Sequence, residues 1–174
     1  MHPMLNTAVS AARLAARIIL MHFDHLDRLE ISTKGRYDFV TEVDREAESA
    51  ILDTILKTYP DHSVLAEESG EISGNEYKWI VDPLDGTTNY IHGYPQFSVS
   101  IAIQKDDRLQ HAVVFDPLRD ELFTASRGEG ARMNDRRIRV SGIKRLDRAL
   151  LGTGFPFAAI KQIDPWLKTF GALL

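Results

Sequence analysis

The sequence contains no cysteine, and no proline- or glycine-rich tract divides its 174 residues. The absence of cysteine excludes disulfide bonds, thiolate metal ligands and a cysteine nucleophile. No uninterrupted apolar run reaches the ~20 residues of a membrane span, because Arg13 and Arg17 interrupt the N-terminal run. No basic stretch precedes that run, as a secretory signal requires. We therefore expect a cytoplasmic protein without membrane contact.

Charge of neither sign dominates, since 21 Lys and Arg face 25 Asp and Glu for a net charge of −4. This composition is that of an ordinary globular domain. The mild acidity argues against a general nucleic-acid binder, which would show a basic patch, and no sequence-specific DNA binding is expected. A run of arginines is expected to face solvent on an edge hairpin: Arg132, Arg136, Arg137 and Arg139.

Two helices are predicted in the first third of the chain. Apolar residues at helical spacing predict a first helix over 3–22. Because residues 1–22 carry two arginines and no acid, they fit either a core helix or a mitochondrial presequence. A polar hairpin region follows at 34–36. Thr41 and Asp44 then have the spacing of a capping box and predict a second helix that stops by Pro60.

Further along the chain, the apolar pattern changes to that of short strands. Strands are predicted at 63–66, 78–81, 97–103, 110–115, 121–125 and 131–140. Residues 1–145 thus read as an α+β domain with two helices packed on an antiparallel sheet. At 146–174 a second α/β unit only begins, with a helix from Asp164. It ends on apolar Gly171–Leu174, so we expect a chain truncated early in that unit.

The densest chemical signal is a string of polar residues directly after an apolar strand, Asp82-Pro83-Leu84-Asp85-Gly86-Thr87-Thr88-Asn89. Two carboxylates in one small volume repel each other unless a cation lies between them, and Mg²⁺ prefers such oxygen ligands. Residues 86–88 are expected to open a helix whose free N–H groups hold a phosphate. The alternative is a plain Asp-Gly turn in which Asp82 only caps the strand.

Two further acidic elements bear on the interpretation as a metal and phosphate site. Glu67 and Glu68 follow the strand at 63–66, so Glu67 and Asp82 would converge if the two strands are neighbours. Taken alone, the sequence Glu67-Glu68 is typical of a solvated turn. Asp38-Phe39-Val40-Thr41, with Asp44, opens the second helix, where an N-cap with acids near the helix dipole is a sufficient explanation.

Several motifs together resemble the inositol monophosphatase family, most closely its bacterial SuhB-type members. Those motifs are Asp38–Thr41 with Asp44, Glu67–Gly70, Trp79–Asn89, Tyr94-Pro95 with Ser98–Ile101, Asp116-Pro117, Glu121–Phe123 and Gly152–Pro156. The resemblance implies the first half of the layered αβαβα sugar-phosphatase fold. It also implies Mg²⁺-dependent hydrolysis of a phosphate monoester, with inositol 1-phosphate as the usual substrate and a homodimer for the complete protein.

The resemblance further implies a set of metal ligands. Glu67, Asp82 and the backbone carbonyl of Leu84 would hold a first Mg²⁺. Asp82 and Asp85 would hold a second, with Asp82 bridging the two ions.

Catalytic and phosphate-binding roles follow from the same resemblance. Glu67, Thr87 and Asp44 would orient and deprotonate the attacking water, while Gly86 and Thr87 would present N–H groups to the phosphate. Such chemistry needs a metal-activated water and in-line geometry, not a phosphoenzyme. A haloacid-dehalogenase-type phosphatase does not fit this sequence. In that class the second Asp lies two residues after the nucleophilic Asp, whereas here Asp85 lies three residues after Asp82 and Pro83 directly follows Asp82.

One departure from the family concerns length, because family members continue through a second α/β layer. That layer carries a Trp-Asp motif, which completes the second metal site, and most substrate-ring contacts. The sequence therefore leaves the identity of the sugar or inositol phosphate open. It also predicts that this chain keeps binding at the first metal but is an inactive fragment without turnover. An alternative function also remains open, that of a non-catalytic binding protein in an antitermination complex with Nus factors and RNA polymerase.

Overall fold

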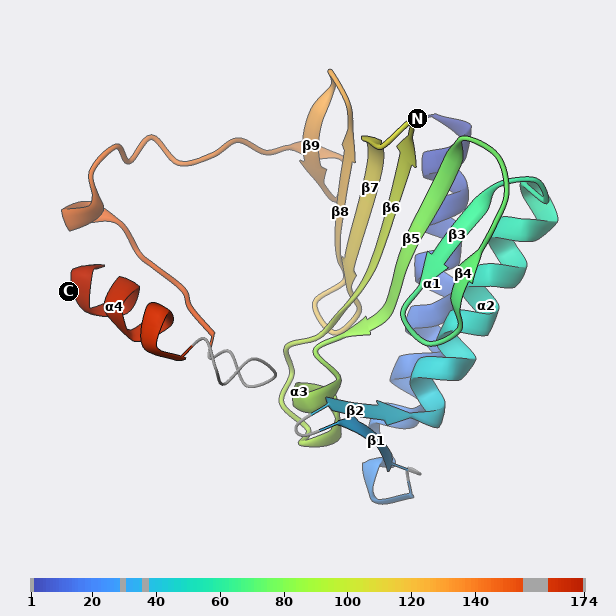
Figure 1. Cartoon of the computed structure of the whole chain (residues 1–174), viewed down its shortest axis with the longest axis horizontal. Coiled ribbons are helices and arrows are strands. Elements are labelled where there is room, and N and C mark those ends of the chain that lie inside the picture. The colour runs from blue at the N-terminus through green and yellow to red at the C-terminus, as the bar shows by residue number, and fades with distance from the viewer. Residues whose placement is uncertain (1, 29–30, 36–37, 155–162, 174) are drawn as a thin grey trace.

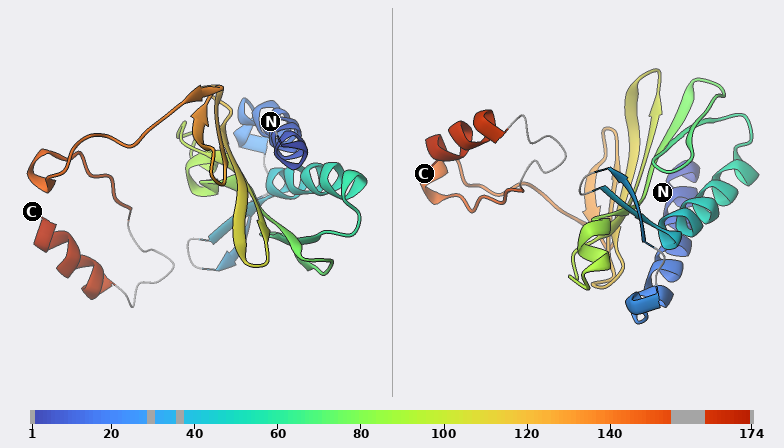
Figure 2. Two further views of the ribbon diagram at one scale, coloured as in Figure 1. Left: turned by 90° about the horizontal axis from the view of Figure 1, so that it is seen from above. Right: turned by 60° about the horizontal axis from the view of Figure 1, so that its bottom comes forward.

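The computed structural model describes residues 2–28, 31–35, 38–154 and 163–173. Two helices, α1 (Pro3–Phe23) and α2 (Glu42–Thr58), pack side by side on one face of an eight-stranded sheet (Figures 1 and 2). The predicted α+β class and both predicted helices are confirmed.

Helix α1 packs closely because its inner face is built from small residues. Ala8, Ala11, Ala12 and Ala15 are fully buried and let α2 and the sheet approach. By length and composition α1 could cross a membrane, yet 44% of its most apolar window is buried inside the fold. Burial in the core explains the apolar character of this helix.

Helix α2 begins at the capping box that the sequence predicts. The Thr41 hydroxyl accepts from the backbone N–H groups of Val43 and Asp44, and the Asp44 carboxylate accepts from the Thr41 N–H at 2.8 Å. A cap of this kind contributes about 1 kcal/mol to stability. It also fixes Asp44, which is 1% exposed, at the start of the helix.

The sheet runs in the order β10-β9-β8-β7-β6-β5-β3-β4. Its strands are β3 (Ser63–Ala66), β4 (Gly70–Ile72), β5 (Tyr77–Asp85), β6 (Ser98–Lys105), β7 (Arg108–Asp116), β8 (Glu121–Ser126), β9 (Gly130–Met133) and β10 (Arg136–Arg137). All described pairs are antiparallel except β3 with β5, which is parallel. Where one strand was expected over 131–140, β9 and β10 form a short hairpin.

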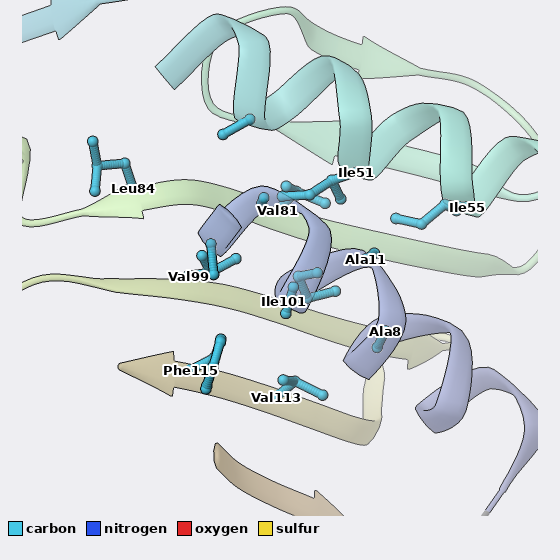
Figure 3. Close-up of a cluster of buried hydrophobic side chains, with 14 of the residues drawn as sticks. Ala8, Ala11, Ile51, Ile55, Val81, Leu84, Val99, Ile101, Val113 and Phe115 are labelled. Atoms are coloured by element: carbon cyan, nitrogen blue, oxygen red, sulfur yellow. The ribbon is translucent and has the colours of Figure 1, made fainter. Parts of the chain in front are cut away.

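The core lies between the helices and this sheet. Figure 3 shows Ala8 and Ala11 of α1 and Ile51 of α2 facing Val81 and Ile101 of the sheet. All five of these side chains are at most 3% exposed. The central strands are thereby fixed in place, and β5 carries the polar string at its end.

The remaining elements lie outside the main sheet. These are the hairpin β1 (Ile31–Gly35) and β2 (Asp38–Thr41), the turns η1 (Leu26–Arg28) and η2 (Leu146–Arg148), and the helices α3 (Thr87–Ile91) and α4 (Ile163–Leu173). After β10 the chain leaves the sheet and runs toward η2 and α4 (Figure 1). Arg36 of the expected hairpin, and Phe155 and Pro156 of the last motif, lie outside the described residues. The boundary near residue 145 stays a prediction.

Candidate active site

The two acidic strand ends lie next to each other. Strand β3 pairs in parallel with β5, with Ala66 opposite Val81, and the Glu67 N–H continues the ladder by donating to the Val81 carbonyl at 3.2 Å. Glu67 and Asp82 are consequently neighbours at one edge of the sheet, where their carboxyl groups interact. The sequence left open whether these two strands are neighbours, and the structure shows that they are.

The Asp82 carboxyl lies in an environment that disfavours its charge. Burial raises the pKa of Asp82, and the nearby Asp85 and Asp44 carboxylates raise it further. The Leu84 N–H, which donates to the Asp82 Oδ1 atom at 3.2 Å, and the neighbouring Glu67 lower the pKa of Asp82. None of the groups that shift this pKa is a cation, so a bound cation would relieve the repulsion.

A bulge in β5 directs the two aspartates. Asp82 pairs with Ser100 and Asp85 with Ser98, so three steps on β5 match two steps on β6. Pro83 lies inside this bulge, where its missing N–H costs no ladder hydrogen bond. Bulges of this kind re-aim side chains next to functional sites. Here the bulge leaves Asp82 half-buried and Asp85 exposed.

Asp44, Thr87 and Leu84 form a second group of contacts, which joins α2 to the end of β5. The Asp44 Oδ2 atom accepts from the Thr41 hydroxyl at 2.6 Å, and Oδ1 lies 3.0 Å from the Thr87 hydroxyl. That hydroxyl also lies 3.0 Å from the Leu84 carbonyl oxygen, so its one proton is shared between two acceptors. Sequence reasoning placed all three in one site, and the structure brings them together.

Gly86 connects β5 to α3 in a conformation that requires glycine. Its φ is +94°, in the left-handed region, and an added Cβ would lie 3.0 Å from the Gln96 carbonyl oxygen. Gly86 is the N-cap of α3, and Thr87 is the first residue of that helix. Gly86 and Thr87, which are predicted to present N–H groups to a phosphate, therefore lie at the start of α3.

We expect Gly86→Ala to destabilise the protein by about 1–3 kcal/mol, because the strained backbone and the contact with Gln96 both oppose the methyl group. Gly128→Ala is the matched control, since Gly128 has a φ of +82° and nothing within 4 Å of an added Cβ. Urea unfolding of both variants measures the difference. Equal losses would show that the contact with Gln96 has no effect.

Glu48 is a residue of this site that sequence reasoning missed. It is 3% exposed on α2, and its two carboxylate oxygens accept from the backbone N–H groups of Glu68 and Ser69 at 2.7 and 2.8 Å. The turn that carries Glu67 is thereby tied to α2. The available signal was a carboxylate one helical turn after Asp44, on the same face as the buried Ile51.

The donor chemistry of the site suits a hard divalent cation. Its oxygens come from the carboxylates of Glu67, Asp82 and Asp85 and from the Leu84 carbonyl, the type of ligand that Mg²⁺ takes. Across the described ranges, no three His, Asp or Glu side chains converge into a ready-made metal site. The ligand assignment therefore stays a prediction, for which the Glu67–Asp82 contact is the closest structural support.

Carboxylates at adjacent strand ends, next to an Asp–Thr pair, are the arrangement that the resemblance to the layered sugar-phosphatase fold implies. A sequence profile of the inositol monophosphatase family matches residues 1–170. The chain belongs to the inositol monophosphatase family.

Individual relatives support this membership. The chain is similar to the Nus factor SuhB of Pseudomonas aeruginosa, with 52% identity over 100% of the chain, and to that of Escherichia coli K12, with 50% identity over 99%. It spans 66% of the length of each.

Solved structures are similar as well. The extragenic suppressor protein suhB from Bartonella henselae superposes with a TM-score of 0.82 and 44% identity, over 83% of this chain and 57% of that one. The Thermotoga maritima IMPase superposes with a TM-score of 0.75 and 37% identity, over 81% and 55% of the two chains. These likenesses confirm the fold that the sequence predicts.

Proposed function

We propose that this site takes part in Mg²⁺-dependent hydrolysis of a phosphate monoester, with inositol 1-phosphate as the first substrate to test. The observation that carries the proposal is the contact between the Glu67 and Asp82 carboxyls beside the Asp44–Thr87–Leu84 group. Family membership supports the phosphatase class, whereas substrate and metal are part of the proposal.

In this proposal Glu67, Asp82 and the Leu84 carbonyl would hold one Mg²⁺, and Asp82 with Asp85 would hold a second. Bound Mg²⁺ would supply positive charge to the phosphate oxygens and would lower the pKa of a coordinated water. Phosphoryl transfer depends mainly on positioning and electrostatic stabilisation, and this chain offers rigid groups for both.

Three side chains would position and activate the water. The Asp44 carboxylate holds the Thr87 hydroxyl at 3.0 Å, so that hydroxyl has a fixed orientation toward the strand end. Thr87 and Glu67 would accept hydrogen bonds from the attacking water, whose single proton would pass either to Glu67 or, through the Thr87 hydroxyl, to Asp44. The backbone N–H groups of Gly86 and Thr87 would bind the phosphate.

Phosphate release from inositol 1-phosphate, measured with this chain across a Mg²⁺ titration, tests the proposal. Any release is expected to rise with Mg²⁺ and to stop on chelation. Release that is insensitive to chelation would contradict it. The chain spans 66% of the length of its relatives, so the same assay on a chain extended to their full length distinguishes a missing ligand from a wrong assignment.

A second candidate function follows from the names of the relatives. Proteins 50–52% identical to this chain are named Nus factor SuhB, and we propose that this protein associates with transcription antitermination factors. A pull-down with RNA polymerase and Nus factors tests this. Asp82→Asn is expected to leave such binding unchanged, and loss of binding in that variant would contradict an association independent of the site.

A further inference from the structure

The charge of this chain is strongly segregated, although its net charge is small. Residues 127–148 hold eight Lys and Arg against three Asp and Glu, a local charge of +5 in a chain of net charge −4. We call the eight residues the basic edge: Arg127, Arg132, Arg136, Arg137, Arg139, Lys144, Arg145 and Arg148. All eight are exposed. The small net charge of the whole chain therefore conceals an exposed, positively charged segment.

Part of the basic edge forms the free margin of the sheet. Strand β10 is the last strand in the sheet order, and it pairs only with β9. In that hairpin Arg137 lies directly opposite Arg132. Like charges in this arrangement are destabilising, so the folded hairpin would gain from a bound anion.

Few acidic groups neutralise these side chains within the fold. Among the described residues, the one ion pair of the basic edge joins Arg145 to Asp147 at 2.8 Å. The Arg132 guanidinium donates a hydrogen bond to the Asp135 backbone carbonyl at 3.4 Å. Most of the positive charge is therefore available to an external partner.

The basic edge is separate from the candidate active site. Four strand spacings lie between β5, which carries Asp82, and β9. At about 4.8 Å a spacing this is roughly 20 Å, more than twice the Debye length of about 8 Å at physiological salt. The arginines on β9 and β10 are therefore too remote to hold a phosphate that is bound at Asp82.

We propose that the basic edge binds the phosphate backbone of a nucleic acid. Seven of its eight cations are arginines, whose planar guanidinium groups bind phosphate oxygens in a bidentate manner. Residues 127–148 contain no aromatic side chain on which bases could stack. Recognition is thus through phosphates and independent of sequence. None of the eight residues belongs to the catalytic proposal, so this inference stands apart from it.

Fluorescence anisotropy of this chain with a labelled 20-nucleotide RNA, and with duplex DNA of the same length, tests the proposal. We expect micromolar binding at about 50 mM salt, with an affinity that falls steeply as salt rises. The triple variant Arg136→Glu, Arg137→Glu, Arg139→Glu is expected to weaken binding more than tenfold. It should also make the salt slope shallower by about two.

The matched control reverses three exposed charges outside the basic edge, Arg17→Glu, Lys57→Glu and Arg108→Glu. It changes the net charge equally and is expected to weaken binding less than threefold. Equal losses in both triple variants, or no binding by the parent chain, would overturn the proposal. So would binding to phosphatidylserine vesicles without binding to either nucleic acid. If unfolding midpoints fall, the corresponding Arg→Gln and Lys→Gln variants replace both triples.

Discussion

Asp82→Asn is expected to lower Mg²⁺-dependent phosphate release by about a thousandfold or more. Asp82 interacts with both Glu67 and Asp85 and, in the proposal, would contact both ions. Metal stabilisation of transferring phosphate oxygens is worth several kcal/mol, and about 4 kcal/mol corresponds to a thousandfold in rate. Phosphate release and Mn²⁺ binding are measured together, so the prediction is checked even where turnover is slow.

The control for this variant is Asp53→Asn, which removes an exposed carboxylate from α2. It makes the same chemical change and is expected to leave both readouts within twofold of the parent chain. Full activity in Asp82→Asn would show that the carboxylates at this sheet edge do not hold the metal.

Glu48→Gln is expected to destabilise the fold by about 2 kcal/mol and to lower phosphate release at least tenfold. The buried Glu48 carboxylate accepts hydrogen bonds from two backbone N–H groups. Hydrogen bonds to a charged group are worth about 1.5–3 kcal/mol. A glutamine offers one acceptor and places an NH₂ group against the second N–H donor. The turn that carries Glu67 would then lose its fixed position.

Glu46→Gln is the matched control, because Glu46 lies on the same helix, is exposed, and has its carboxylate 3.4 Å from the His22 imidazole. A role of Glu48 in positioning Glu67 predicts a weaker Mg²⁺ affinity at temperatures where the variant is fully folded. Loss of stability with unchanged Mg²⁺ dependence would show that the role of Glu48 is purely structural.

Local patterns in the sequence predicted the elements that depend on neighbouring residues. The capping box of Thr41 and Asp44 and the alternation along β6 are signals of this kind, and both elements form where expected. The split of the expected strand at 131–140 also had a local cause. Asn134 and Asp135 adopt positive φ values of 46° and 63° and form the tight turn between β9 and β10.

Contacts between distant residues could not be predicted in the same way. Whether Glu67 lies beside Asp82 depends on the parallel pairing of β3 with β5, which no local pattern specifies. Glu48 was missed because its partners lie 20 and 21 residues further along the chain. Resemblance to a family supplied the roles of Asp44 and Thr87, and the structure supplied the contact between them.

Anomalous diffraction from crystals of this chain soaked in Mn²⁺ tests the central claim most directly. The account predicts a strong peak within about 2.5 Å of the Asp82 carboxylate and the Leu84 carbonyl oxygen, the distance range of hard divalent cations. The peak should be absent from crystals of Asp82→Asn. A saturated Mn²⁺ site elsewhere, with no peak at this edge of the sheet, would contradict the assignment.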